Sequence, residues 1–226
     1  DQSIFISHKL VNNTNSSVIR GVGVDTEYYL PIPEPIEEKP LIVFPARMLY
    51  DKGLETLIEA ARILKKRLNV RFALVGDTDA GNPTSASELT LKAWENEGLI
   101  EWWGFQEDML SVYQKSNIVT LPSFGEGLPT VLIEAAACGR AIVTTDVAGC
   151  RDVVENGVNG LLVAQKNPEA LAHALEKLIL DPSMRLRMGI AGRLIALKKF
   201  TNKQVLDETF HIYTHLLQEK KDNYPL

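Results

Sequence analysis

The sequence predicts an α/β protein in which helices cover both faces of a doubly wound parallel sheet. Short apolar runs, typical of strands buried on both faces, alternate with longer amphipathic segments between residues 41 and 200. Glycine, proline and polar turn residues separate these segments, and no internal repeat is evident. Strands that alternate with helices favour a parallel sheet with right-handed crossovers, whose ligands bind beyond the carboxyl ends of the strands.

The expected strands begin with the continuous apolar run at 41–46. The others are expected at 70–76, 99–104, 117–122, 141–145 and, as an edge strand, 160–163.

The first expected helix spans 51–68, because Leu54, Leu57, Ala61 and Leu64 recur on one side. A polar loop at 77–85 precedes a helix that ends near residue 98. Further helices are expected at 108–115, 129–138, 151–155, 168–180, 182–197 and 202–220.

The first 20 residues are predicted to form a tail, with a polar loop at 12–17 and a short strand at 17–20. Four prolines between 31 and 40 then indicate a stiff, extended connector. The chain has no initiator methionine, and we interpret it as a fragment of a longer protein.

Composition excludes several function classes. The net charge of 24 − 29 = −5 leaves no polybasic footprint for a nucleic acid. The sequence has no run of about eighteen apolar residues, which a membrane-spanning helix would require. Its polar start does not resemble a signal peptide. The two cysteines fit a reducing cytoplasm, which is the expected location.

The most informative stretch is 123–139, a glycine-rich turn that leads into a helix. Pro129 is expected at the first helical position and Gly139 at the stop. The free N–H groups of Gly127, Leu128 and Thr130 would then form a site suited to phosphate. Two carboxylates, Glu126 before the helix and Glu134 within it, flank that site; a plain amphipathic helix is the simpler interpretation of the same residues.

A second group of residues follows the first strand. Arg47 and Lys52 stand in the loop 46–53, which matches neither a dinucleotide fingerprint nor a P-loop. Phe105 and Gln106 follow the third strand. Because carboxyl ends of parallel strands share one sheet edge, these side chains are expected near Glu126.

Taken together, Glu126 and Glu134 with seven residues between them, Arg47, Lys52 and the run 156–163 resemble the donor site of retaining glycosyltransferases with the GT-B fold. The resemblance is to glycosyltransferase family four in particular and covers about residues 17–220. It implies the Rossmann-like C-terminal half of a two-domain enzyme. The implied divisions are a linker at 1–20 from an N-terminal domain outside this chain, a donor-binding domain at 21–200 and a closing helix at 201–226.

The resemblance also implies roles. Glu126 would hold hydroxyls of the transferred sugar, and Glu134 would bind the ribose. Arg47 and Lys52 would stabilise the departing diphosphate, whose charge grows as the glycosidic bond breaks. Phe105 and Gln106 would meet the nucleobase. The residues implied to meet the diphosphate at the helix entry are Gly127, Leu128, Pro129 and Thr130.

The implied partners are a nucleotide sugar, with UDP as the expected nucleotide, and a glycan or lipid-linked acceptor held by the N-terminal domain. The donor is expected to carry a hexose or N-acetylhexosamine for cell-surface polysaccharide synthesis. No cofactor or metal is expected, because the two cations and the helix end would replace a metal ion. We also expect peripheral membrane association of the full-length enzyme and self-association of the fragment through the apolar face of its last helix.

Two alternatives stay open at this point. A sugar-nucleotide epimerase of the same architecture would bind the same donor but would require acid and base groups in the cleft. A non-catalytic nucleotide-binding module would need only the phosphate and nucleobase contacts. Transfer to an acceptor separates the glycosyltransferase from both.

Overall fold

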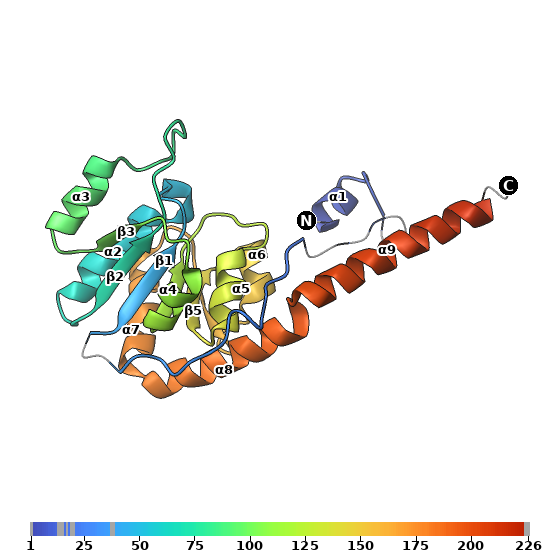
Figure 1. Ribbon diagram of the computed structural model, residues 1–226. Coiled ribbons are helices and arrows are strands. Elements are labelled where there is room, and N and C mark those ends of the chain that lie inside the picture. The colour runs from blue at the N-terminus through green and yellow to red at the C-terminus, as the bar shows by residue number, and fades with distance from the viewer. Residues whose placement is uncertain (1, 13–15, 17, 19–20, 37–38, 224–226) are drawn as a thin grey trace.

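The computed structural model describes residues 2–12, 16, 18, 21–36 and 39–223. Its centre is a six-stranded sheet in the order β3-β2-β1-β4-β5-β6 (Figure 1). All neighbouring strands are parallel, which confirms the predicted fold class. The strands are β1 (Leu41–Pro45), β2 (Arg71–Val75), β3 (Glu101–Gly104), β4 (Ile118–Leu121), β5 (Ala141–Thr145) and β6 (Gly160–Val163).

Helices connect the strands and close the chain (Figure 1). They are α1 (Gln2–Ser7), α2 (Leu54–Lys65), α3 (Glu88–Asn96), α4 (Met109–Lys115), α5 (Thr130–Ala137), α6 (Ala148–Val153), α7 (Pro168–Leu180), α8 (Pro182–Lys199) and α9 (Asn202–Asn223). Within the described part of the chain, none of them combines the length and hydrophobicity that a bilayer span requires.

The strand residues alternate between two hydrophobic clusters. Ile42 and Phe44 of β1 point into the larger cluster, which includes apolar residues of α2 and α7. Leu41 and Val43 point to the other face, where Val112 of α4 covers them. Both faces of β1 are therefore buried, as the continuous apolar run predicted.

The single helix predicted at 51–68 is wrong at both ends. A 3-10 turn (Tyr50–Lys52) comes first, Gly53 follows with φ of 81°, and α2 ends at Lys65. A Cβ atom on Gly53 would lie 2.0 Å from the carbonyl oxygen of Pro122. Only glycine accepts this contact together with a left-handed backbone, so the helix is interrupted there.

Two other helix boundaries differ from prediction. Pro129 is not the first residue of α5 but its N-cap, with an extended ψ of 99°, and the helix begins at Thr130. The helix predicted at 151–155 begins earlier, at Ala148, and ends at Val153. Arg151 therefore lies in the second half of α6, and its guanidinium pairs with the Asp146 carboxylate at 2.8 Å.

At the N-terminus, residues 2–7 form α1 where the sequence predicted a tail without regular structure. The predicted strand at 17–20 falls outside the described residues apart from Val18. The division at residues 20 and 200 stays a prediction.

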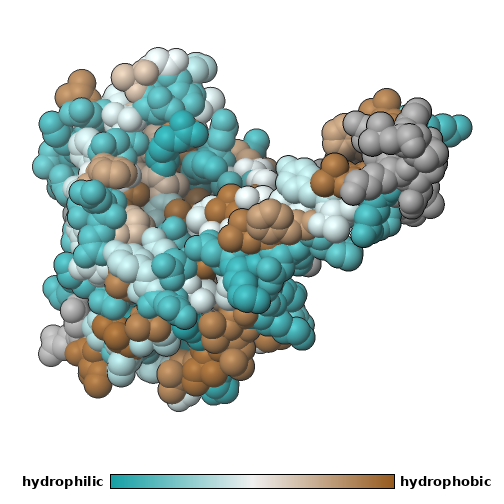
Figure 2. Space-filling model, turned by 45° about the vertical axis from the view of Figure 1, so that its right-hand side comes forward, coloured by the Kyte–Doolittle hydropathy of each residue, from teal (hydrophilic) through white to brown (hydrophobic). Residues whose placement is uncertain are grey.

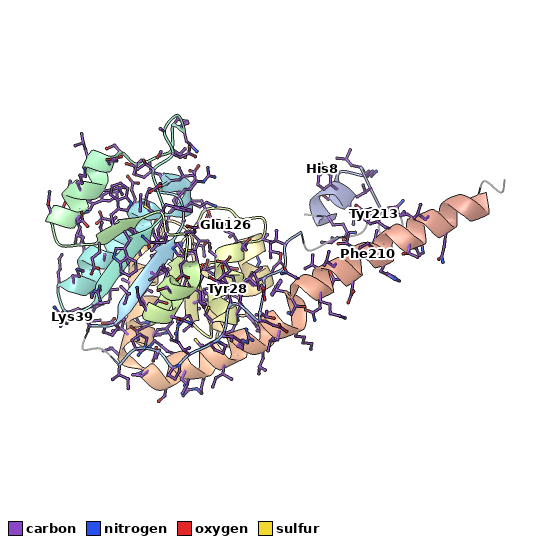
Figure 3. All side chains as sticks on the ribbon, in the orientation of Figure 1. His8, Tyr28, Lys39, Glu126, Phe210 and Tyr213 are labelled. Carbon is purple, nitrogen blue, oxygen red and sulfur yellow. The ribbon has the colours of Figure 1, made fainter. Side chains whose placement is uncertain are left out.

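The chain enters and leaves the α/β body at one place. Val24 pairs with Thr201 as a β-bridge, and the Val24 N–H donates to the carbonyl of Phe200 at 2.8 Å. From there α9 projects away from the body (Figure 1). Figure 3 shows Phe210 and Tyr213 on this projecting part, and both are more than half exposed.

Candidate functional site

The strand order changes direction between β1 and β4, where β1 leads to β2 on one side and β4 leads to β5 on the other. Loops that leave two such strands diverge and open a crevice at the carboxyl edge of the sheet, the usual ligand site of doubly wound folds. In this protein those loops are 46–53 and 122–129. They contain most of the predicted site residues.

The two loops are joined by several contacts. The Phe124 N–H donates to the carbonyl of Asp51 at 2.9 Å, and the Ser123 hydroxyl donates to the same carbonyl at 3.2 Å. Gly53 lies against the backbone of Pro122. Lys52 lies between Asp51 and Gly53, so these contacts fix its position relative to the turn before α5.

Lys52 and Glu126 form an ion pair between the two loops. The Lys52 Nζ donates to Glu126 Oε1 at 2.7 Å, and the two side chains are 26% and 10% exposed. Low exposure strengthens the interaction relative to a surface pair. Figure 3 places Glu126 at this edge of the sheet.

The entry to α5 leaves backbone donors unused. Among the described residues, the N–H groups of Gly127, Leu128, Thr130 and Val131 have no hydrogen-bond partner, and Pro129 supplies no side-chain cap. Free amides and the positive end of the helix dipole favour an anion at this point. The first turn of α6 packs closely on this segment, since a Cβ on Gly149 would lie 2.2 Å from the carbonyl oxygen of Gly127.

A cavity of about 460 Å³ lies beside the first turn of α5, where β1, β2 and β3 end. Arg47, Phe105 and Gln106 line it, and Val131 in the first turn of α5 forms part of its wall. Phe105 is 69% exposed, so it is not a core residue. Its N–H donates to Asp77 Oδ1 at 2.9 Å, which assigns Asp77 a loop-fixing contact.

Arg47 is held less firmly than Lys52. Its guanidinium donates to Asp79 at 2.6 Å, but the two side chains are 63% and 31% exposed. A pair this exposed contributes little to stability and exchanges readily. Arg47 can therefore turn from Asp79 towards an anion in the cavity.

Glu134 has a different environment. Its carboxylate accepts a hydrogen bond from the Tyr113 hydroxyl at 2.8 Å and also interacts with Tyr29. Burial raises the pKa of Glu134, and the two tyrosine hydrogen bonds oppose that rise. The protonated form is thus easier to reach than in an exposed glutamate.

The position of Glu134 follows from helix geometry. Met109 of α4 and Val131 of α5 line the cavity, and Tyr113 and Glu134 lie one turn further along the same helices. Glu134 therefore lies behind the cavity wall and is not among the residues that line it.

The structure thus brings Lys52, Glu126 and the free amides of 127–131 to one edge of the sheet, and Arg47, Phe105 and Gln106 line the cavity beside α5. Glu134 stands apart by one helical turn. Sequence reasoning missed Asp79, Tyr29 and Tyr113, and only the polar character of 77–85 hinted at a partner for Arg47. The roles of all these residues in binding stay predictions.

These features define a class: a Rossmann-like domain with unpartnered backbone amides at its switch point, and its fold is that of one half of a GT-B glycosyltransferase. The family is shown by comparison with known proteins. Residues 29–195 match the model of the family "Glycosyl transferases group 1", and the chain belongs to that family. The resemblance found in the sequence is confirmed.

Relatives with assigned names have similar sequences. The chain is 34% identical over 184 residues to N,N'-diacetylbacillosaminyl-diphospho-undecaprenol alpha-1,3-N-acetylgalactosaminyltransferase of Campylobacter jejuni, covering 76% of this chain and 47% of that protein. It is 32% identical over 183 residues to the capsular polysaccharide biosynthesis glycosyltransferase CapM of Staphylococcus aureus, covering 80% and 47%. The chain thus spans about half the length of these curated relatives.

Solved structures share the fold. Anabaena HepE in complex with UDP aligns with a TM-score of 0.84 at 23% identity, over 95% of this chain and 61% of that one. The C-terminal domain of the glycosyl transferase group 1 protein LpcC from Francisella tularensis aligns with a TM-score of 0.70 at 25% identity. That alignment covers 80% of this chain and 100% of the LpcC domain.

Proposed function

We propose that this chain is the donor-binding domain of a retaining glycosyltransferase that moves a hexose or N-acetylhexosamine from a UDP-sugar to a glycan or lipid-linked acceptor. The observation that supports it most is the meeting of the Lys52–Glu126 pair with the unpartnered amides of 127–131 at the switch point. A diphosphate needs fixed positive charge there, and a sugar needs an acceptor of hydroxyl hydrogen bonds close by.

The roles follow from position. Lys52 and the α5 amides would hold the diphosphate, and Arg47 would join them after leaving Asp79. Glu126 would accept hydroxyl hydrogen bonds from the sugar while Lys52 keeps it in place. Phe105 and Gln106 would contact the base in the cavity.

Glu134 would bind the ribose. Its carboxylate would exchange the tyrosine hydrogen bonds for ribose hydroxyls at the cavity edge. This step requires a side-chain rotation, since Glu134 lies one turn behind the wall.

The chemistry proposed for these residues is stabilisation of the leaving group. As the glycosidic bond breaks, negative charge grows on the diphosphate, and pre-positioned cations and amides stabilise the transition state more than the ground state. We propose that this charge suffices without a metal ion; unchanged transfer in the presence of EDTA would support this, and loss of transfer that added Mg²⁺ restores would contradict it.

The choice of UDP rests on the named neighbours. HepE was solved with UDP, and the Campylobacter relative is named for N-acetylgalactosamine transfer to a diphospho-undecaprenol substrate. These names describe those proteins, and for this chain they support a lipid-linked acceptor in cell-surface polysaccharide synthesis.

A thermal-shift series tests the binding step. UDP should raise the melting temperature of this chain more than ADP, GDP or UMP, because a ligand stabilises the state that binds it. Equal shifts with all four, or none, would contradict the proposal. The full-length protein should then transfer the sugar with the anomeric configuration kept, whereas the chain alone should bind nucleotide without transfer. Conversion of the donor sugar in the absence of an acceptor would indicate an epimerase instead.

A further inference from the structure

The outer side of α8 carries an apolar stripe that no other described part of the chain covers. Its members recur every three or four residues and fall within about 80° of the helix circumference. Their side chains are 40–61% exposed: Leu186 59%, Ile190 55%, Leu194 61% and Leu197 40%. Isolated exposed leucines are common, but a continuous row on one helix indicates a contact surface.

A groove adjoins this stripe. The connector residues Pro31, Ile32 and Pro33 run beside α8 and enclose a hollow of about 360 Å³ with Ile190 and Leu194. Ile32 is itself 43% exposed. Figure 2 shows apolar surface gathered along the lower edge of the molecule, where α8 runs in Figure 1.

The opposite side of α8 is fully engaged. Gly189 packs so closely on the end of α5 that an added Cβ would lie 2.0 Å from the carbonyl of Gly139. Arg185 is buried in an ion pair with Glu34 at 2.9 Å, and Arg193 donates to the carbonyls of Thr26 and Tyr29. The helix is therefore anchored firmly, and its exposed face is a fixed surface of the folded domain.

The charge of this segment is opposite to that of the whole chain. Residues 182–206 contain six Lys and Arg and no Asp or Glu, although the chain as a whole carries −5. Arg187, Lys198 and Lys199 are exposed and form no ion pair within the described residues. On the helix circumference, Arg187 and Lys198 lie within about 40° of the edge of the stripe, whereas Lys199 lies on the opposite side of the helix. Apolar and cationic groups are thus combined on one surface.

A second copy of this chain fits the stripe poorly. In a two-fold symmetric contact the same cations would face each other without any acidic residue of 182–206 to neutralise them. Chain that precedes residue 24 enters beside Thr201, next to Leu197 but about 20 Å along the helix axis from Leu186, so it meets only one end of the stripe. An anionic lipid surface matches both the apolar and the cationic groups of this surface, since acyl chains accept the apolar stripe and phosphate headgroups accept the cations.

We propose that the stripe Leu186, Ile190, Leu194 and Leu197, with the cations Arg187 and Lys198, binds the surface of an anionic membrane. The helix lies in the plane of the interface, and the groove beside it receives part of the acyl boundary. This inference is independent of nucleotide binding, so failure of the proposed function would leave it unaffected.

The test is sedimentation of the natural full-length protein with phosphatidylcholine vesicles, with and without phosphatidylglycerol. The protein should bind only the anionic vesicles, and raised salt should weaken binding. Arg187→Gln/Lys198→Gln should reduce partitioning roughly 25-fold, since each basic residue near a charged surface contributes about one factor of five. Ile190→Asn/Leu194→Asn should also release the protein.

Matched controls separate the surface from general effects. Lys92→Gln/Lys177→Gln changes the net charge equally on α3 and α7, and Phe210→Asn/Leu217→Asn removes two exposed apolar groups from α9. Both should bind vesicles like the unaltered protein, and urea denaturation should show that every variant is folded. The proposal fails if the α8 variants bind normally, or if the unaltered protein ignores anionic vesicles. It also fails if Ile190→Asn/Leu194→Asn abolishes a concentration-dependent dimer while vesicle binding persists.

Discussion

Glu126 and Glu134 stand eight positions apart on either side of the same helix entry, yet their surroundings differ completely. Glu126 is 10% exposed and bonded to the Lys52 ammonium at 2.7 Å. Glu134 is half-buried against the Tyr113 hydroxyl, with burial that raises its pKa. One carboxylate is balanced by a cation, and the other is surrounded by neutral donors.

This difference separates stability from function at the two positions. A charge that is paired contributes to folding, so removal of either partner destabilises the domain. A charge held only by phenols costs stability when ionised, so it is retained for another reason, which we propose to be ribose binding. The mutations below use this contrast, beginning with the largest expected effect.

Lys52→Met removes the cation from the paired side of the comparison. Transfer by the full-length enzyme should fall about 100- to 1000-fold, because a pre-positioned donor to the leaving group is lost. The unfolding free energy should fall by about 2 kcal/mol, since Glu126 stays largely buried without its partner. Initial-rate assays and urea denaturation measure the two effects.

The double variant Lys52→Met/Glu126→Gln is the matched control for this prediction. Removing both charges should recover most of the lost stability, because no unpaired charge is left, while transfer stays low. If transfer also recovered, neither charge would be needed for transfer, and the roles proposed for Lys52 at the diphosphate and Glu126 at the sugar would be wrong.

Glu134→Gln tests the unpaired side. UDP affinity should fall roughly 10- to 100-fold, the loss expected when one or two charge-assisted hydrogen bonds to the ribose disappear. The melting temperature at pH 7 should nevertheless rise, since the ionised carboxylate no longer has to be held in a half-buried site. Calorimetry and thermal unfolding at pH 7 measure the two changes.

The pH dependence of this stabilisation has a definite sign. The pKa of Glu134 is raised in the folded state, so below the unfolded value of about 4.3 the carboxyl is neutral in both states and costs nothing. The free energy of unfolding falls as the pH rises from the pKa of Glu134 in the unfolded state to its higher pKa in the folded state. The advantage of Glu134→Gln should therefore shrink as the pH is lowered to about 4; an advantage that is the same at every pH would exclude this cause.

Most of the fold was predictable because it depends on local patterns. Continuous apolar runs marked the strands, and their alternation with amphipathic segments marked the parallel topology. The boundaries that were wrong depend on contacts distant in sequence. Gly53 interrupts a helix because of Pro122, nearly 70 positions later, and no local signal near residue 53 contains that information.

The site was predictable only in part, for the same reason. Residues that follow strands had to converge at one edge, which placed Lys52 and Glu126 together. The partners of Glu134 could not be found, because Tyr29 and Tyr113 come from a connector and a neighbouring helix. Side-chain pairing across elements depends on helix packing, which sequence spacing does not encode.

Tyr113→Phe sharpens the comparison by removing one neutral donor. The unfolding free energy at pH 7 should fall by about 1 kcal/mol, the net contribution of one hydrogen bond. The pKa of Glu134 should rise further, because this hydrogen bond favours the ionised form. Urea denaturation at pH 7 and pH 4 should show a smaller loss at the lower pH; an equal loss at both would attribute the effect to packing of the buried ring.

Asp79→Asn has the smallest expected effect and tests the exposed counterpart of the Lys52–Glu126 pair. Stability should change by no more than about 1 kcal/mol, because the Arg47–Asp79 pair is largely solvated. UDP affinity should increase a few-fold, since Arg47 no longer has to leave a carboxylate before it reaches the diphosphate, and the gain should diminish with added salt. Calorimetry at two salt concentrations measures this, with Asp146→Asn as a control that frees Arg151 at the neighbouring loop. Unchanged affinity would mean that Arg47 stays outside the diphosphate site, and fixed positive charge would then come from Lys52 and the α5 amides alone.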